Sequence, residues 1–351
     1  MWKALLGTMT ALISANALAQ SNLTLFGSIG GGLRWTDGVN GGHVFGFDNN
    51  AISGNGIGIT GTEDIGHDTK VFFGLQSGFD IGSGKLAKSD VLFSQLANVG
   101  VSGAFGRVSL GRQLTAGDDT GLLFDPNYAQ GTLASAPLGV WGGDIFTGNS
   151  RFANTIKYEG SAGGLTVRAS YSSGGVAGSL RAGSDISLGA TWQYQTVLVG
   201  AAYQETYSAD GSRRARTMLG GADWQIGPSR LYLSYADFAV SAPAANASQR
   251  HDSIPAAGIV YRVTPFLQVL GAVYYDFGRN LNNAPGADGH KVSAYAIAEY
   301  FLSKRTRLYA EFDRNSFSGA YKTDRTNVLG LQKPPDGSTM AGVSVGVITQ
   351  F

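Results

Sequence analysis

Few residue patterns in this chain have the types and spacing that chemistry needs, and the first is a run of glycines. Gly56-x-Gly58-x-x-Gly61 matches the fingerprint that binds a dinucleotide. A dinucleotide site needs a helix immediately after the third glycine. Here Thr62 to Gly66 predicts a turn into another strand, so the pattern does not indicate nucleotide binding.

The candidate metal ligands are four scattered histidines. These are His43, His67, His251 and His290. They fall in separate expected loops or turns without paired spacing, and the chain has no cysteine. A metal site needs ligands that converge on one point, so we expect no metal and no cofactor. No serine, histidine and acid constellation is visible either, although a triad can be placed on strand ends, and catalysis is therefore not excluded.

Charge patterns give two further indications. Arg213, Arg214 and Arg216 form a basic cluster in an expected loop, which could meet anionic lipopolysaccharide or a charged solute, although a solvated loop is the simpler interpretation. Without Lys3, the 26 basic residues of the chain become 25 and equal the 25 acidic ones. This balance gives no reason to expect nucleic acid as a partner.

The first 19 residues have the pattern of a secretory signal peptide. Lys3 precedes an apolar run from Ala4 to Ile13, and Ala17-Leu18-Ala19 follows as a cleavage site. The apolar run is too short to span a bilayer, and no later stretch reaches about 18 unbroken apolar residues, as a spanning helix would require. We therefore expect a mature chain that begins at Gln20, outside the cytoplasm.

The elements that must position any functional residue are expected to be strands. The last segment places Val343, Val345, Val347 and Phe351 on one alternating face, which suits the lipid-facing side of an outer-membrane β-barrel. Alternating segments of about ten residues recur along the chain, and each can cross a membrane once as a tilted strand. Closure into a barrel would supply the stability that disulfides give other proteins outside the cytoplasm. A closed sheet has no edge, so every backbone N–H and C=O group pairs with a neighbouring strand.

Connections alternate between tight turns and long polar stretches. The long stretches run over 36–51, 114–150, 238–253 and 314–337, and the asymmetry is typical of outer-membrane barrels. Counting strands between the connections gives about 16, a size that leaves an aqueous lumen. The expected fold is therefore an all-β, antiparallel transmembrane barrel over residues 20–351, without a second domain.

At this point six segments carry a family resemblance. The segments are Leu23–Gly27, Gly58–Gly66, Val99–Gly106, Ser109–Gln113, Asn154–Tyr158 and Leu302–Tyr309. With these segments in this order, the chain resembles the trimeric general diffusion porins of Gram-negative bacteria, in the form common among β-proteobacteria. The resemblance extends over essentially the whole mature length. The resemblance implies a homotrimer of sixteen-stranded barrels in the outer membrane, in contact with lipid and lipopolysaccharide. It implies passive passage of ions and small hydrophilic solutes, and no enzyme activity.

The resemblance also implies a constriction, formed where the third loop folds into the pore. In this sequence that loop spans 114–149, and its acids are expected to face basic groups on the barrel wall and create a transverse field. Inward parity on the following strands selects the basic candidates. The loop acids are Asp118, Asp119, Asp125 and Asp144, the wall candidates are Arg151, Lys157 and Arg168, and Phe351 is the expected C-terminal assembly signal.

The chain departs from the family pattern at three positions that bear on selectivity. Gly56 and Gln95 stand where relatives carry arginine, and Gln76 stands where glutamate is frequent. Fewer wall arginines predict a wide, weakly selective pore. The alternative is an outer-membrane barrel that acts as an enzyme or an adhesin. A channel needs the third loop folded inward, whereas an adhesin would project it, and an enzyme would place a nucleophile beside a base.

Overall fold

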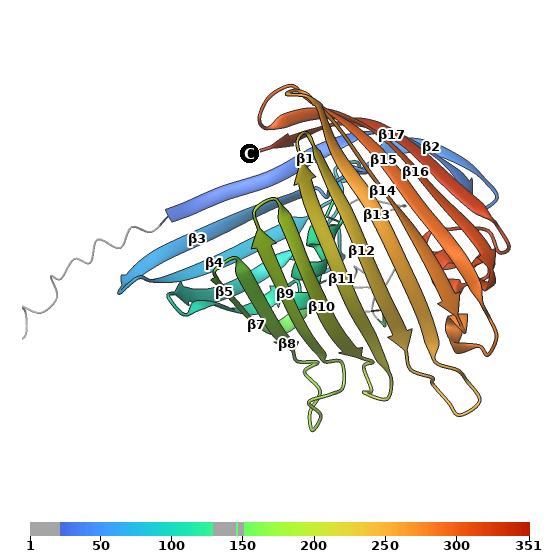
Figure 1. Cartoon of the computed structure of the whole chain (residues 1–351), viewed down its shortest axis with the longest axis horizontal. Coiled ribbons are helices and arrows are strands. Elements are labelled where there is room, and N and C mark those ends of the chain that lie inside the picture. Colours follow the sequence, from blue (N-terminus) through green and yellow to red (C-terminus); the bar gives the residue numbers. More distant parts are fainter. Residues whose placement is uncertain (1–21, 129–144, 147–150) are drawn as a thin grey trace, which may run out of the picture.

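Strands make up nearly all the regular structure in the described part of this chain, and they form one sheet that closes on itself (Figure 1). The computed structural model describes residues 22–128, 145–146 and 151–351, so the expected signal peptide lies outside the described residues. Within that part the strands are β1 (Asn22–Val39), β2 (Gly42–Asp48), β3 (Gly56–Gly66), β4 (Thr69–Gly78), β5 (Leu96–Gly103), β6 (Gly106–Gln113), β7 (Phe152–Ala162), β8 (Leu165–Ser172), β9 (Asp185–Tyr194), β10 (Val197–Tyr207), β11 (Arg214–Ile226), β12 (Ser229–Val240), β13 (Arg250–Thr264), β14 (Leu267–Arg279), β15 (Gly289–Phe301), β16 (Thr306–Gly319) and β17 (Thr339–Gln350).

Within the described residues, helical structure is confined to short connecting pieces. Two α-helical turns and three 3₁₀ turns occur in the described residues: α1 (Ala116–Gly121), α2 (Arg325–Gly330), η1 (Leu122–Phe124), η2 (Leu281–Asn283) and η3 (Ala320–Lys322). None of the described helices has the length and apolar character needed to cross a membrane.

The barrel closes through antiparallel pairing of its first and last strands. Residues 28–37 of β1 pair with residues 341–350 of β17. On its other edge β1 pairs with β2 over its second half and with β3 over residues 22–28. Strands β2 and β3 thus act as one interrupted strand, and the described chain forms a closed barrel of sixteen strands. The expected strand number and fold class are confirmed.

The first long connection expected from the sequence, 36–51, is wrong in detail. Strands β1 and β2 continue through it as a hairpin, joined by Asn40 and Gly41. Both residues have a positive φ, of 48° and 82°, as a two-residue turn matched to the twist of the strands requires. An Asn-Gly pair is a strong hairpin signal, so the sequence contained the information.

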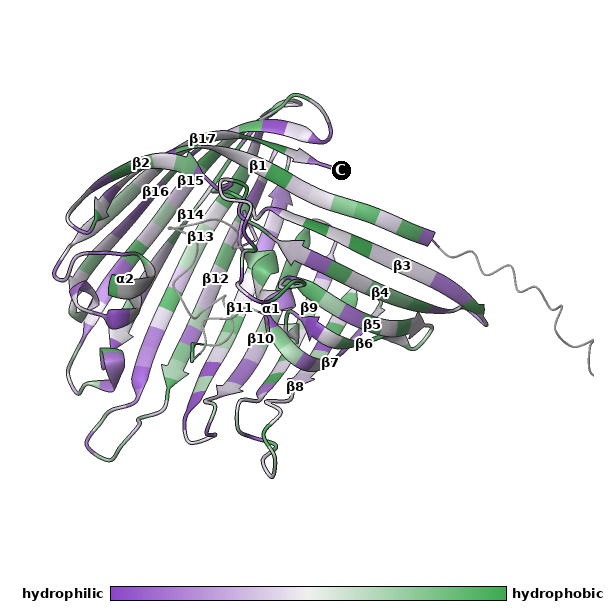
Figure 2. Cartoon of the chain, turned by 180° about the vertical axis from the view of Figure 1, so that it is seen from behind, coloured by the Kyte–Doolittle hydropathy of each residue, from purple (hydrophilic) through white to green (hydrophobic). Residues whose placement is uncertain are grey.

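The two faces of the sheet have opposite character, and hydrophilic and hydrophobic residues alternate along the strands (Figure 2). On β9 the side chains of Asp185, Ser187 and Thr191 are buried inside the barrel, whereas Leu188 and Trp192 are exposed on the outside. A protein surrounded by water shows the reverse distribution. An apolar outer band is therefore available to hydrocarbon around the barrel.

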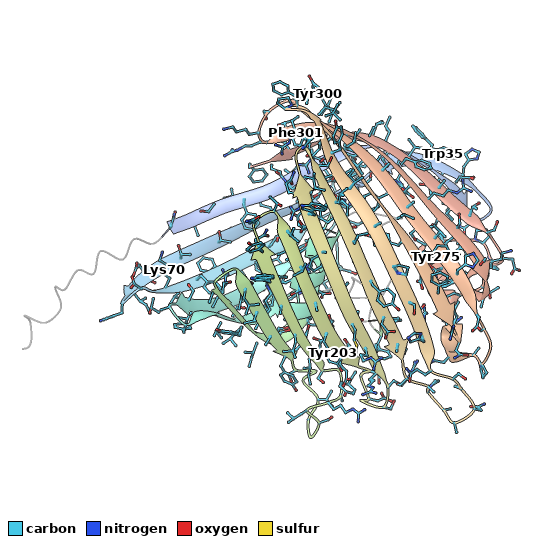
Figure 3. The ribbon with its side chains drawn as sticks, viewed as in Figure 1. Trp35, Lys70, Tyr203, Tyr275, Tyr300 and Phe301 are labelled. Atoms are coloured by element: carbon cyan, nitrogen blue, oxygen red, sulfur yellow. The ribbon has the colours of Figure 1, made fainter. Side chains whose placement is uncertain are left out.

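Aromatic side chains lie on the outer surface at both ends of the strands (Figure 3). Tyr300 marks the end with short turns, and Tyr275 lies towards the end with long loops. Trp192 and Tyr194 stack with ring centroids 5.6 Å apart near another short turn. Rings in these positions match the interfacial girdles of membrane barrels, where an apolar body meets a wet boundary.

Phe351 extends the closure of the barrel beyond β17. Its backbone exchanges two hydrogen bonds of 3.1 Å with Gly27. Its ring covers Gly27 so closely that a Cβ added there would lie 2.5 Å from Cζ of Phe351. The closing seam therefore requires both the ring and the absence of a side chain beneath it.

We expect that Phe351→Ala and Gly27→Leu both lower the yield of folded barrel. The first removes the apolar cover of the seam, and the second forces the ring away at a cost of about 1–3 kcal/mol. The heat-modifiable shift in gel electrophoresis measures the folded fraction. Gly46→Leu is the matched control, because a Cβ added at Gly46 meets nothing within 4 Å. Folding yields equal to that of the control would contradict the seam role.

Candidate functional site

The described first part of loop three, the connection from β6 to β7, runs inside the barrel (Figure 2). Its helix α1 packs against β8, β9, β10 and β11, and the following turn η1 contacts β11 and β12. The Thr115 hydroxyl accepts a 3.1 Å hydrogen bond from the Asp118 amide and so caps α1. The amides of Ala116 and Gly117 donate to Ser170 and Ser187 on the wall, at 2.9 and 2.6 Å. Wall hydroxyls thus satisfy helix N–H groups that would otherwise be unpaired.

Glycines of the wall make room for loop three, and Gly189 and Gly221 are two of them. A Cβ added at Gly189 would collide with the hydroxyl of Thr120, and one added at Gly221 would collide with the ring of Phe124, each at less than 3.0 Å. Contacts of that length do not occur between real side chains, so any larger residue would displace the loop. The absence of side chains at these wall glycines therefore determines the path of loop three.

The far end of described loop three is anchored across the barrel. The hydroxyls of Tyr274 on β14 and Tyr295 on β15 donate to the Asp125 carboxylate. Asn127 donates a 3.0 Å hydrogen bond to the carbonyl of Ile52, in the interruption between β2 and β3. The sequence placed Asp125 among the pore acids, but the structure buries it completely. It anchors the loop and does not face open water.

Asp118 is also covered, between α1 and the wall. Its side chain is 4% exposed, and its Oδ2 has no hydrogen-bond partner in the described residues. Burial raises the pKa of the Asp118 carboxyl well above its ordinary value, and nearby Asp185 raises it further, against the opposing effects of Thr115 and Arg151. The group therefore favours the protonated form when loop three is seated.

The raised pKa of Asp118 predicts that seating of loop three weakens as pH rises. The seated form binds the proton more tightly, so its stabilising contribution is complete below the ordinary value of 3.8 and is lost as pH rises through the raised pKa. Hydrogen exchange of the α1 amides, compared between wild type and Asp118→Asn at each pH, measures the effect. The two proteins should agree in acid, and the variant should be better protected at neutral pH. A constant ratio across pH would contradict the prediction.

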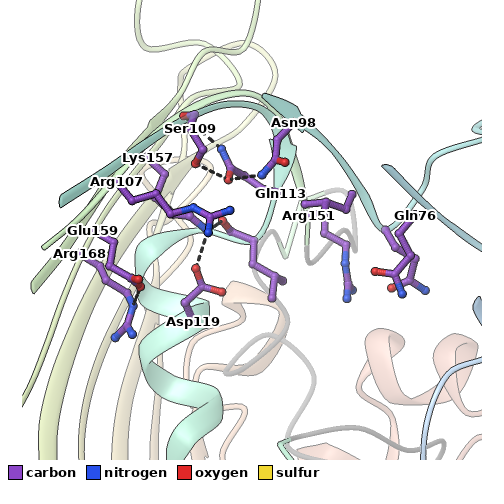
Figure 4. Close-up of a pocket in the computed structure, with 13 residues that line it drawn as sticks. Gln76, Asn98, Arg107, Ser109, Gln113, Asp119, Arg151, Lys157, Glu159 and Arg168 are labelled. Carbon is purple, nitrogen blue, oxygen red and sulfur yellow. Dashed lines mark hydrogen bonds and ion pairs between the residues drawn. The ribbon is translucent and has the colours of Figure 1, made fainter. Parts of the chain in front are cut away.

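Asp119 lies instead at a cavity of about 430 Å³ between loop three and the wall (Figure 4). Its carboxylate pairs with Nζ of Lys157 at 2.5 Å, and Arg168 pairs with Glu159 at 2.6 Å. The cavity is lined by residues of β4 to β8, of the connection between β4 and β5, and of loop three: Gln76, Gln95, Leu96, Asn98, Arg107, Ser109, Gln113, Leu114, Asp119, Arg151, Lys157, Glu159 and Arg168. The structure thus brings together Asp119, Arg151, Lys157 and Arg168 from the residues selected by sequence.

The lining has more basic than acidic groups. Four basic side chains, Arg107, Arg151, Lys157 and Arg168, face two acids, Asp119 and Glu159. Burial lowers the pKa of Arg151, chiefly by desolvation and against the attraction of Asp118, but a guanidinium stays charged at neutral pH. We call these four residues the basic wall.

Sequence reasoning missed Arg107. It shares inward parity with Ser109 on β6, and that signal could have identified it. Its guanidinium lies 3.6 Å from the centroid of the Phe72 ring, which holds it against the wall. The other expected acid, Asp144, lies outside the described residues, and its position in the pore stays a prediction.

The departures from the expected arginine pattern also meet at this cavity. Gln76 and Gln95 both line it, and a Cβ added at Gly56 would lie 3.2 Å from Nε2 of Gln76. Three positions around the cavity are therefore neutral. The positive charge of the lining depends on the basic wall alone.

The last long connection folds back over the end of the barrel with the long loops (Figure 2). Asp252 accepts a 2.7 Å hydrogen bond from Arg250 and another of 2.5 Å from the Tyr321 hydroxyl. Arg250 also lies 3.6 Å from Asp324. These buried, paired charges tie η3 and the start of α2 to the wall.

Comparison with known proteins gives a consistent result. The family model described as Gram-negative porin matches residues 6–320. An outer membrane porin protein of Bordetella pertussis is 33% identical over 124 residues, which cover 31% of this chain and only 32% of that protein. An anion-selective porin from Comamonas acidovorans has a TM-score of 0.81 at 19% identity, over 95% of this chain and 100% of that chain. The trimer form of OmpT from Vibrio cholerae has a TM-score of 0.70 at 14% identity, over 94% and 99%.

Proposed function

Because this chain belongs to the Gram-negative porin family, we propose that it forms a water-filled channel across the outer membrane. Ions and small hydrophilic solutes diffuse through it passively. The observation that carries the proposal is the seating of loop three. Its described first part lies inside a closed barrel, and Asp119 lines a cavity together with the basic wall and pairs there with Lys157. An adhesin would project this loop outwards, and no covalent chemistry is needed for passage.

The channel has a weak preference for anions. The basic wall exceeds the acids of the cavity by two charges, and an excess of one sign at a constriction favours counter-ions. The Comamonas protein of similar fold is described as anion-selective. The preference here is weak because Gln76, Gln95 and Gly56 leave neutral positions around the passage, and because Asp119 and Glu159 neutralise part of the wall.

The proposed working form is a homotrimer in the outer membrane, assembled after removal of residues 1–19. The outer face near the closing seam is apolar and exposed, with Leu23, Leu25, Val343 and Val345 as contributors to subunit or lipid contact. A similar fold occurs in a trimer form in the Vibrio protein. Phe351 serves as the assembly signal because it completes the seam with Gly27.

Recordings of the purified protein in planar bilayers test the channel. Stepwise openings in multiples of three would support a trimeric channel, and single steps would support the channel but not the trimer. Silent bilayers with protein that is heat-modifiable, and therefore folded, would overturn the proposal and favour an adhesin. A reversal potential that shows anions favoured more than about tenfold would contradict weak selectivity, because a net attraction of about 1 kcal/mol, as from one charge 4 Å away in water, corresponds to less than tenfold.

A further inference from the structure

Two uncharged amide side chains share the cavity with the basic wall, and selection by charge does not use them. Gln76 near the end of β4 and Gln95 just before β5 line the cavity together with Asn98 on β5. The carboxamide of Asn98 is engaged, since its Nδ2 donates a 3.2 Å hydrogen bond to Gln113. The carboxamides of Gln76 and Gln95 have no hydrogen-bond partner within the described residues, and both side chains are half-buried. We call Gln76 and Gln95 the amide pair.

Glycines beneath the amide pair leave room for both carboxamides. Gly56 on β3 and Gly78 on β4 are cross-strand partners. A Cβ added at Gly78 would lie 2.6 Å from Nε2 of Gln95, and one added at Gly56 would lie 3.2 Å from Nε2 of Gln76. Because directly opposite residues of antiparallel strands are about 4.5–5.5 Å apart, the two carboxamides lie over neighbouring points of the wall.

Backbone contacts hold the amide pair in place. The backbone N–H of Gln95 donates a 3.1 Å hydrogen bond to the carbonyl of Gln76. The Ser94 hydroxyl accepts a 3.3 Å hydrogen bond from the N–H of Gly78, and the Ser94 carbonyl accepts one of 2.9 Å from Arg112. The segment that carries Gln95 is therefore tied to β4 and β6. Carboxamides on such a preorganised frame lose little freedom when a solute binds.

Positive charge lies next to the amide pair along the lining of the cavity. Figure 4 shows the Arg151 side chain between Gln76 and the ion pair of Lys157. All these side chains line the same cavity of about 430 Å³. A solute inside it therefore meets basic groups on one side and uncharged amides on the other.

The amide pair offers a different hydrogen-bonding chemistry from the basic wall. Guanidinium and ammonium groups only donate hydrogen bonds, whereas a carboxamide donates and accepts them. A hydroxyl group also donates and accepts, so it complements a carboxamide in either direction. An alkyl chain in the same place displaces water from the carboxamides without replacing its hydrogen bonds, which is unfavourable. The amide pair therefore distinguishes solutes of equal charge by their hydroxyl groups.

We propose that this cavity raises the permeability of polyhydroxy carboxylates, the sugar acids, relative to alkyl carboxylates of the same charge and chain length. The carboxylate lies at the basic wall, and hydroxyl groups along the chain exchange hydrogen bonds with the amide pair. The inference rests on the proposed channel and names a solute class for it. Charge alone does not make this distinction, because the two kinds of anion carry the same charge.

The test compares gluconate with hexanoate, two six-carbon monocarboxylates, by their reversal potentials against chloride in planar bilayers. Gln76→Met/Gln95→Met keeps side-chain length and charge but removes both carboxamides. Its gluconate-to-hexanoate permeability ratio should fall about two- to tenfold below that of wild type, as the loss of one hydrogen bond in competition with water predicts. The chloride-to-potassium ratio should stay unchanged. Gln193→Met/Gln225→Met is the matched control, because both amides donate to carbonyls at short turns away from the cavity.

The glycines beneath the amide pair are tested separately by Gly78→Ala. Its added Cβ displaces the carboxamide of Gln95 without removing a polar group, so the permeability ratio should fall as in the double variant. Gly46→Ala is the control, because a Cβ added there meets nothing within 4 Å. The heat-modifiable shift shows that each variant is folded.

The possible outcomes separate the solute preference from the channel itself. A ratio in Gln76→Met/Gln95→Met equal to that of wild type, or to that of its control, would overturn the preference. Equal falls in gluconate and hexanoate permeability would assign the effect to the width of the passage and would also overturn it. Folded protein that carries no current at all would contradict the channel, whereas potassium chloride currents with an unchanged ratio contradict only the preference.

Discussion

Gly221→Leu is expected to push loop three off the wall and to raise the single-channel conductance. A Cβ at residue 221 would collide with the ring of Phe124, which fills the gap between η1 and the wall. Overpacking of this kind costs about 1–3 kcal/mol, and the loop can relieve it by leaving its seat. The barrel should survive, because residue 221 keeps its backbone pairing with Gly200 and Ser234.

The control for this prediction is Ala222→Leu, the next residue on β11. Its side chain points outwards, on the same face as Trp224, so the added volume meets lipid and leaves loop three untouched. Planar-bilayer recordings and hydrogen exchange of the α1 amides measure the two consequences. Wild-type conductance together with wild-type protection of α1 in Gly221→Leu would show that the loop is not held by this contact.

Neutralisation of three of the four basic-wall residues is expected to abolish the anion preference and to favour cations slightly. Arg107→Gln, Lys157→Gln and Arg168→Gln together leave Arg151 against the two acids of the cavity. An ion that passes 4 Å from one charge in water gains or loses about 1 kcal/mol, so the permeability ratio should change several-fold. The reversal potential in a KCl gradient measures it. The change should be largest at low salt, because the screening length is about 10 Å at 0.1 M and shorter above it.

Asp119→Asn should act in the opposite direction. It removes an acid from loop three and frees Lys157 from its ion pair, so the anion preference should increase. Lys304→Gln serves as control, since this residue lies in a short turn away from the cavity. Shifts of the same sign in the wall variant and in Asp119→Asn would rule out control of selectivity by this cavity.

Much of the fold could be predicted because barrel strands alternate with period two. That rule placed Val343 and Val345 outwards and put Lys157 and Arg168 on the lumen side, and the count of strands between connections gave the strand number. The rule also covered Arg107, which was missed only because its strand precedes the long loop. The interruption between β2 and β3 could not be predicted, because Asn55 replaces strand pairing with side-chain hydrogen bonds to both backbone groups of Gly30.

The roles of the loop acids were the least predictable part of the site. Asp118 and Asp119 are neighbours in sequence, yet one is buried against the wall and the other meets Lys157 at the cavity. The difference depends on the path of loop three, which the wall glycines and the tyrosines around Asp125 determine. These partners are far away in sequence, and no local pattern connects them to the loop.

The most direct test of a wet lumen inside an apolar exterior is chemical modification during bilayer recording. The chain has no cysteine, so a single one can be introduced at the cavity as Gln76→Cys or on the outer surface as Leu233→Cys, a position 63% exposed. A charged, membrane-impermeant thiosulfonate should reduce the current through Gln76→Cys channels and leave Leu233→Cys channels unchanged. Unaltered current through Gln76→Cys, with the residue shown to be unmodified, would contradict a water-filled passage beside the basic wall.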